Sequence, residues 1–135
     1  MTELVLSDGR FVFDQAPGAL LLADRDLIVI RANAAFGALV ELSPEEVVGQ
    51  NEHELLRPDA RDAAEKRLEA LGVDDQPFAF DQRFEHPDGH DLCLRVHVAA
   101  AQDDAGQRFF LAQIEDTTAH RRTTARLLRL ASVTI

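Results

Sequence analysis

The sequence is short of cysteine and of basic residues, and it has no long apolar run. Cys93 is the one cysteine among 135 residues, so no disulfide can form within the chain, and we expect a cytoplasmic protein. The 14 lysines and arginines face 24 aspartates and glutamates, for a net charge of −10. This balance argues against nucleic acid as a direct partner, because phosphate binding needs clustered cations. No apolar run reaches the roughly 18 to 20 residues that span a bilayer, so no membrane partner is expected.

Catalytic and metal-binding motifs are also missing. The sequence contains no His-Glu-x-x-His, no phosphate loop and no Ser-x-x-Lys. Cys93 and His97 share a predicted strand face but lie about 13 Å apart, too far for a nucleophile and its base. His86, Asp88 and His90 flank a predicted turn, where exposed polarity is a simpler interpretation than a metal site. We predict that the chain has no catalytic residue, binds no metal and is not an enzyme. A small enzyme with the same α+β fold is the less favoured alternative.

What is present is organised around residues 107–118, which predict a central strand. The apolar residues on one face are Phe110, Ala112 and Ile114, and those on the other are Phe109 and Leu111. A strand that is apolar on both faces is normally covered on both faces. The strand ends in Asp-Thr-Thr, whose members are candidate helix caps, and residues 119–130 that follow are rich in helix formers.

The first half of the chain predicts a hairpin and short helices. Strands are expected at 19–23 and 27–31, joined by a polar turn. Asn33 is a candidate cap for the helix that follows. The next helix has clear punctuation, with Ser43 as its cap, a proline at its first position, Glu46 completing a capping box and a glycine at its end.

The second half predicts one longer helix and three strands. Residues 51–56 predict a single turn at most, and Pro58 is expected to open a helix that Gly72 closes. Alternation of apolar and polar residues then predicts strands at 78–85 and 92–98 around an Asp-Gly turn, before the central strand. This order is typical of an α+β fold with an antiparallel sheet.

In the order and spacing of these motifs the sequence resembles a PAS domain, a small sensory module of bacterial signalling proteins. The matching segments are Ala16–Gly18, Asp24–Ile28, Asn33–Phe36, Ser43–Gly49, Asp88–Gly89, Asp104–Gly106 and Asp116–Thr118. The resemblance covers about residues 12–120 and implies a five-stranded antiparallel sheet of order 2-1-5-4-3. Helices would pack over one face, with a ligand cavity between.

The resemblance also implies how the chain is divided and what it serves. Residues 1–16 would form an N-terminal cap segment, 17–118 the core and 119–135 an exit helix. Asp116 and Thr118 match the Asp-x-Thr motif that couples core to exit helix. The expected function is a sensory and dimerisation module in a two-component or similar system. It would relay a signal to a histidine kinase, a diguanylate cyclase or a transcription regulator, unless the chain is a single-domain module.

Cofactors of PAS relatives can be compared with this sequence. Flavin relatives carry a reactive cysteine in the region of 51–56, which has none here, and a glutamine where Ile114 stands. Haem relatives often place the iron-binding histidine in the long helix, which has none here. We therefore expect no cofactor, with a small organic ligand as a possibility and a haem or flavin sensor as the alternative.

A ligand cavity would be lined by apolar residues from several elements. The candidates are Leu20, Leu22, Ile28, Phe36, Leu39, Val48, Leu55, Leu68, Phe80, Leu94, Phe110 and Ile114. The same residues would equally form a fully packed core. His53 is expected to face this space, either as a ligand contact or as a hydrogen-bonded structural histidine.

A homodimer is expected from the second face of the central strand. Phe109 and Leu111 would form an exposed apolar patch at the sheet centre. Phe11 and Phe13 of the N-terminal segment, with Leu4 and Leu6, would cover it within one chain or reach a second copy. The exit helix adds a weaker indication, because residues at spacings of four and three recur as in a two-helix seam: His120, Thr124, Leu127 and Ala131.

Overall fold

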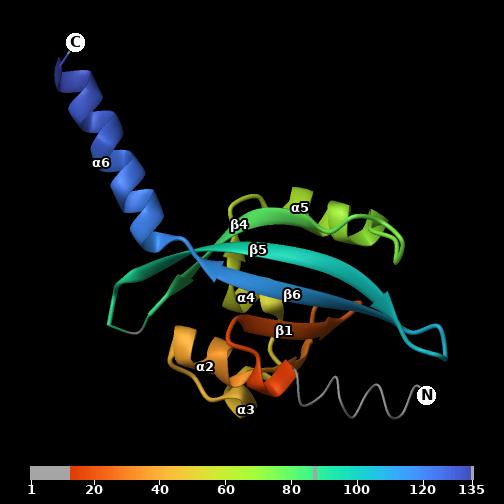
Figure 1. Ribbon diagram of the computed structural model, residues 1–135. Coiled ribbons are helices and arrows are strands. Elements are labelled where there is room, and N and C mark those ends of the chain that lie inside the picture. The colour runs from red at the N-terminus through yellow and green to blue at the C-terminus, as the bar shows by residue number, and fades with distance from the viewer. Residues whose placement is uncertain (1–12, 87, 135) are drawn as a thin grey trace.

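The computed structural model describes residues 13–86 and 88–134. Predictions made for Leu4, Leu6 and Phe11 lie outside these residues. The elements follow in the order β1 (Ala19–Asp24), β2 (Val29–Ala32), α2 (Ala34–Val40), α3 (Pro44–Val47), α4 (Glu52–Leu55), β3 (Arg57–Pro58), α5 (Arg61–Ala70), β4 (Phe78–Glu85), β5 (Asp91–Gln102), β6 (Arg108–Asp116) and α6 (Thr118–Thr134). Figure 1 shows α6 leaving the body of the domain from the end of β6.

The sheet is antiparallel with the strand order β2-β1-β6-β5-β4-β3. The predicted α+β fold and the order of five strands are confirmed, with β6 in the middle between β1 and β5. A sixth strand, β3, was not predicted. It consists of Arg57 and Pro58, which pair with Arg83 and Gln82 at the end of β4.

The long helix begins later than predicted. Pro58 belongs to β3, and α5 starts only at Arg61, after Ala60 in a non-helical conformation that makes no side-chain cap. A proline suits an edge strand because its missing N–H is not needed there. Pairing with β4 therefore takes Pro58 away from the helix-opening position that its residue type favours.

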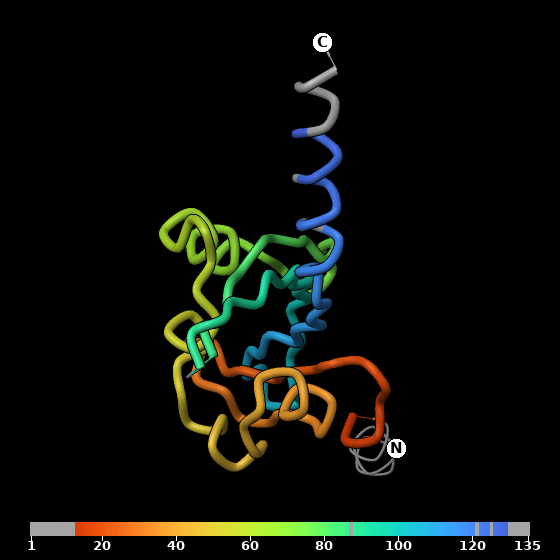
Figure 2. The backbone as a smooth tube through the Cα atoms, turned by 90° about the vertical axis from the view of Figure 1, so that its left-hand side faces the viewer, coloured from red at the N-terminus to blue at the C-terminus, as the bar shows by residue number. Residues whose placement is uncertain are grey.

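The two faces of β6 have different environments. Phe110, Ala112 and Ile114 are buried on the inner face, at 3%, 1% and 5% exposure. On the outer face Phe109 is half-buried and Leu111 is 38% exposed. The predicted alternation is confirmed. Figure 2 shows α5 on one side of the sheet and the red segment that leads into β1 near its other side.

Asn33 ties the first helix to the first strand. Its Oδ1 accepts hydrogen bonds from the backbone N–H of Phe36 and of Leu20, both at 3.0 Å, and its Nδ2 donates to the Gly18 carbonyl. The side chain is buried but fully engaged, as a buried amide must be. The capping box of Ser43 and Glu46 is present as predicted.

None of the helices within the described residues combines the length and apolar character that crossing a membrane requires.

Candidate functional site

A cleft of about 890 Å³ opens between the β1–β2 turn, α5 and the start of β6. Leu27, Leu68 and Phe110 are its buried apolar walls. Its other lining residues are mostly polar or charged: Asp24, Arg25, Asp26, Asn51, Glu65, Glu69, Gly106, Gln107 and Arg108. The cleft therefore combines a charged rim with three buried apolar residues, and its lining is more polar than that of most small-molecule sites.

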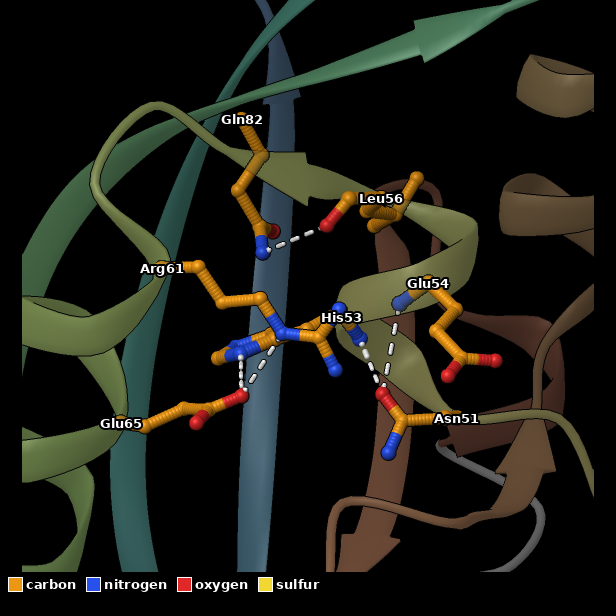
Figure 3. Close-up of polar contacts among 7 residues, drawn as sticks. All are labelled: Asn51, His53, Glu54, Leu56, Arg61, Glu65 and Gln82. Atoms are coloured by element: carbon orange, nitrogen blue, oxygen red, sulfur yellow. Dashed lines mark hydrogen bonds and ion pairs between the residues drawn. The ribbon is translucent and has the colours of Figure 1, made fainter.

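The short helix α4 turns two polar side chains into the core beside this cleft. Asn51 caps the helix, because its Oδ1 accepts from the backbone N–H of His53 and of Glu54. Glu52 and His53 are then buried, at 3% and 1% exposure. The His53 ring lies edge-on to the Phe80 ring, with centroids 6.0 Å apart. Figure 3 shows His53 reaching from α4 toward α5.

Two residues of α5 form an ion pair beside His53. Glu65 Oε1 lies 3.5 Å from His53 Nδ1 and accepts a hydrogen bond from Arg61 Nε at 2.9 Å, as Figure 3 shows. The hydrogen bond from Arg61 lowers the pKa of Glu65, which keeps it ionised. Burial lowers the pKa of His53, and the nearby Glu65 opposes this only in part. His53 is therefore neutral at pH 7.

Several buried polar atoms in this region lack hydrogen bonds. Gln82 Nε2 donates to the Leu56 carbonyl at 3.0 Å, but Gln82 Oε1 and both His53 ring nitrogens have no hydrogen-bond partner among the described residues. An unsatisfied buried polar group costs about 1 to 3 kcal/mol. His53 is buried with its Nδ1 3.5 Å from Glu65 Oε1, and its contact with a ligand stays a prediction.

Glu52 is the second unusual group. Burial raises the pKa of its carboxyl to about 7, because the charged form loses its contact with water. At neutral pH this side chain is divided between its acid and carboxylate forms. Perturbed carboxyls in a core are enriched at functional sites, although structural groups also show such shifts.

The other predicted lining residues are distributed between the core and the surface. Phe36, Leu68, Leu94, Phe110 and Ile114 are buried in the main core cluster, and Leu39, Leu55 and Phe80 pack against it.

Four of the predicted lining residues lie differently. Val48 is 44% exposed, because the adjacent Val47 points inward instead. Leu22 pairs with Leu111 on the outer face, and Leu20 is half-buried on the same face. Leu21, between them, is the fully buried inward residue. Ile28 is half-buried and bridges to Asn51.

Sequence reasoning missed Glu52 and Gln82. Gln82 occupies the inward phase of β4 between Phe80 and Phe84, so a polar residue in an apolar register was the available signal. Glu52 gave no such signal, because a four-residue helix is too short to show an amphipathic period.

A second feature is the junction between β6 and α6. The Cys93 carbonyl accepts from Thr117 N–H at 2.8 Å and Thr117 Oγ1 at 3.1 Å, and Cys93 N–H donates to Thr118 Oγ1 at 2.9 Å. Asp116 Oδ1 accepts from the Thr118 N–H at 2.9 Å. The first residues of the exit helix are therefore bonded directly to β5. Asp116, Thr117 and Thr118 all take part, and the hydrogen bonds to β5 were not predicted.

The β4–β5 turn differs from the expectation of exposed polarity. His86 is only 4% exposed, packs edge-on against Phe84, and its Nδ1 lies 3.2 Å from Glu41 Oε2. His90 Nδ1 lies 2.6 Å from Asp88 Oδ1. Across residues 13–86 and 88–134 no group of three or more potential ligands is arranged to hold a metal.

Comparison with known proteins identifies the family that has this fold. The family model of the PAS fold matches residues 7–117. The chain belongs to the PAS family. Domains of this family generally serve signalling rather than catalysis. No curated protein matches the chain.

Solved structures of PAS proteins share the fold. The chain is similar to the PAS domain of an HTR-like protein from Haloarcula marismortui, at 24% identity and a TM-score of 0.69, covering 84% of this chain and 98% of that one. The PAS domain of a two-component sensor histidine kinase matches at 15% identity and a TM-score of 0.65, over 86% and 99%. An RNA-binding light-oxygen-voltage receptor matches at 23% identity and a TM-score of 0.80, over 98% of this chain and 39% of the receptor.

The cysteine and the histidine considered above for flavin and haem are not at the expected positions. Cys93 lies on the outward phase of β5, between buried Leu92 and Leu94, on the face opposite α4 and α5. A flavin held against α4 would not meet this thiol. Helix α5 carries no histidine to bind a haem iron.

Proposed function

We propose that this PAS domain senses a small organic ligand beside α4 and α5 and relays the bound state through α6 to an output domain. The hydrogen bonds that join Cys93 with Thr117 and Thr118 carry this proposal. They join the exit helix to β5 as well as to β6. A change in the relative position of the two strands therefore alters the direction of α6.

The route from the site to the junction is short and continuous. Phe110 lines the cleft and belongs to β6, whose last residue, Asp116, holds the Thr118 N–H. The inward side chains of β6 and β5 pack together along this route, with Ile114 paired with Val96. A ligand that shifts β6 at Phe110 therefore acts on the paired strands β5 and β6, which end at the junction.

The proposal includes a homodimer formed through the outer face of the sheet. Leu22 and Leu111 pair there, Phe109 lies half-buried, and β5 contributes the small residue Ala99 beside Leu111. An apolar surface of this kind favours association. Phe13 is buried at 9% beneath the Arg31 guanidinium, 4.6 Å from its ring centre, so it borders this face within the same chain.

The relay is tested by fusing the chain, in helical phase after α6, to the catalytic half of a histidine kinase. Autophosphorylation is compared for the wild type, Thr118→Val and Asp116→Ala. The variants should change kinase activity, because the junction no longer holds the helix at its angle. Unchanged kinase activity in well-folded variants would show that the junction relays nothing. Thr123→Val, at an exposed site further along α6, is the matched control.

A further inference from the structure

The unpaired polar atoms beside α4 gather in one place. His53 packs on Phe80, and Gln82 is the next inward residue on β4, about 7 Å further along the strand. Figure 3 shows the Gln82 amide and the His53 side chain between α4, α5 and the sheet. Both side chains are fully buried, so no bulk water reaches these atoms.

The protonation state of His53 determines which of its ring nitrogens can accept a hydrogen bond from a ligand. Burial lowers the pKa of His53, so the ring is neutral and carries one proton. Its Nδ1 faces the Glu65 carboxylate at 3.5 Å, which assigns the proton to Nδ1. His53 Nε2 is then an acceptor. Gln82 is oriented by donating its Nε2 to the Leu56 carbonyl, so its Oε1 is a second acceptor.

Two buried acceptors without a donor require a particular partner. A carboxylate would bring a third set of acceptors into the space, and Glu65 at the entrance would repel it. An ammonium ion would lose its hydration on entering this site, and two uncharged acceptors would not compensate for that loss. An uncharged –NH2 group provides two N–H donors at little desolvation cost.

We propose that His53 and Gln82 form the recognition end of the ligand site, and that they bind an uncharged planar molecule through a primary amide or amino group. This inference rests on the proposed ligand-sensing function and gives its ligand a chemical class. The ligand enters from the cleft, whose lining includes Glu65, and Glu65 Oε1 lies 3.5 Å from His53 Nδ1. Arg61 holds Glu65 in that position and is itself partly exposed, so the pair can open without disturbing the core.

The experiment uses two ring compounds that differ in one group. Benzamide carries –NH2 where acetophenone carries –CH3, and the two are otherwise almost the same in shape. Binding to the full chain is followed by NMR, through the side-chain amide signals of Gln82 and the ring signals of His53. Benzamide should bind about tenfold more tightly than acetophenone, as expected for the hydrogen bonds that only it can make. Benzoate should not bind.

Variants assign the preference to the cluster. Gln82→Met removes the acceptor at similar size and should bring benzamide down to the affinity of acetophenone. Gln113→Met, at an exposed position on the outer face of β6, is the matched control and should leave the preference intact. His53→Phe provides a second test should Gln82→Met fail to fold.

Equal binding of benzamide and acetophenone overturns the inference, as does a preference that survives in both cluster variants. Binding of neither compound overturns it too, and indicates that ordered water satisfies these atoms. None of these results decides the relay, which the kinase fusion tests separately.

Discussion

Replacing Glu52 by glutamine should stabilise the domain at neutral and alkaline pH and leave it almost unchanged in acid. The glutamine has nearly the same shape but no charge to bury. In the wild type, burial raises the carboxyl pKa from 4.5 to about 7. The folded chain therefore binds a proton more tightly than the unfolded chain. Stability associated with this group is complete below the unfolded pKa and is lost as the pH rises through the folded pKa.

The magnitude follows from the two pKa values. A difference of about 2.5 pH units corresponds to about 3 kcal/mol, since one unit is about 1.4 kcal/mol. The wild type should lose roughly 1 kcal/mol of this by about pH 5 and nearly all of it by about pH 8. His53 has the opposite dependence, because burial lowers its pKa and its contribution is lost as the pH falls. His53 is present in both proteins, so its contribution cancels when the free energy of unfolding of the wild type is subtracted from that of Glu52→Gln.

Urea unfolding at about pH 5 and about pH 8 measures the difference. With a slope near 2 kcal/mol per molar, the midpoint of the variant should exceed that of the wild type by about 1.5 M at the higher pH. Glu54→Gln, an exposed neighbour in the same helix, is the matched control and should show no comparable gain. A Glu52→Gln variant that is equally stable, or whose advantage does not grow with pH, would refute the reasoning.

Three further outcomes are expected. Thr118→Val should lower the free energy of unfolding by about 1 kcal/mol, measured by urea titration, because Cys93 N–H loses its acceptor; no loss would mean that this bond contributes nothing. The wild type should be dimeric by light scattering and the variant with Phe109→Glu and Leu111→Glu monomeric but folded; a monomeric wild type contradicts the proposed interface. The protein purified from cells supplied with haem and flavin should be colourless, and a visible absorption band would refute the expectation of no such cofactor.

Much of the fold could be predicted because its signals are local. The two-faced pattern of residues 109–114 identified the central strand, since a period of two is read directly from neighbouring residues. Asn33 and the Ser43 capping box were recognisable because a cap and its partners lie within one turn. These signals depend little on the rest of the chain.

What could not be predicted depends on contacts between distant segments. β3 exists only because residues 57 and 58 meet β4, and no local pattern indicates that pairing. The choice of Leu21 over Leu22 as the inward residue was hidden in a run of three leucines. The site was the least predictable part, because burial of Glu52 and His53 follows from how α4 packs rather than from their residue types.

Amide hydrogen exchange tests most directly whether the ligand region and the junction form one cooperative unit. At about pH 8, exchange of the Cys93 and Thr117 amides is compared in the wild type and Glu52→Gln, with the core amide of Val96 as the reference. If the unit is cooperative, all three should slow by the same factor, roughly a hundredfold for about 3 kcal/mol. Slowing of Val96 alone, with Cys93 and Thr117 unchanged, would show that the junction opens independently of the core and would contradict the relay.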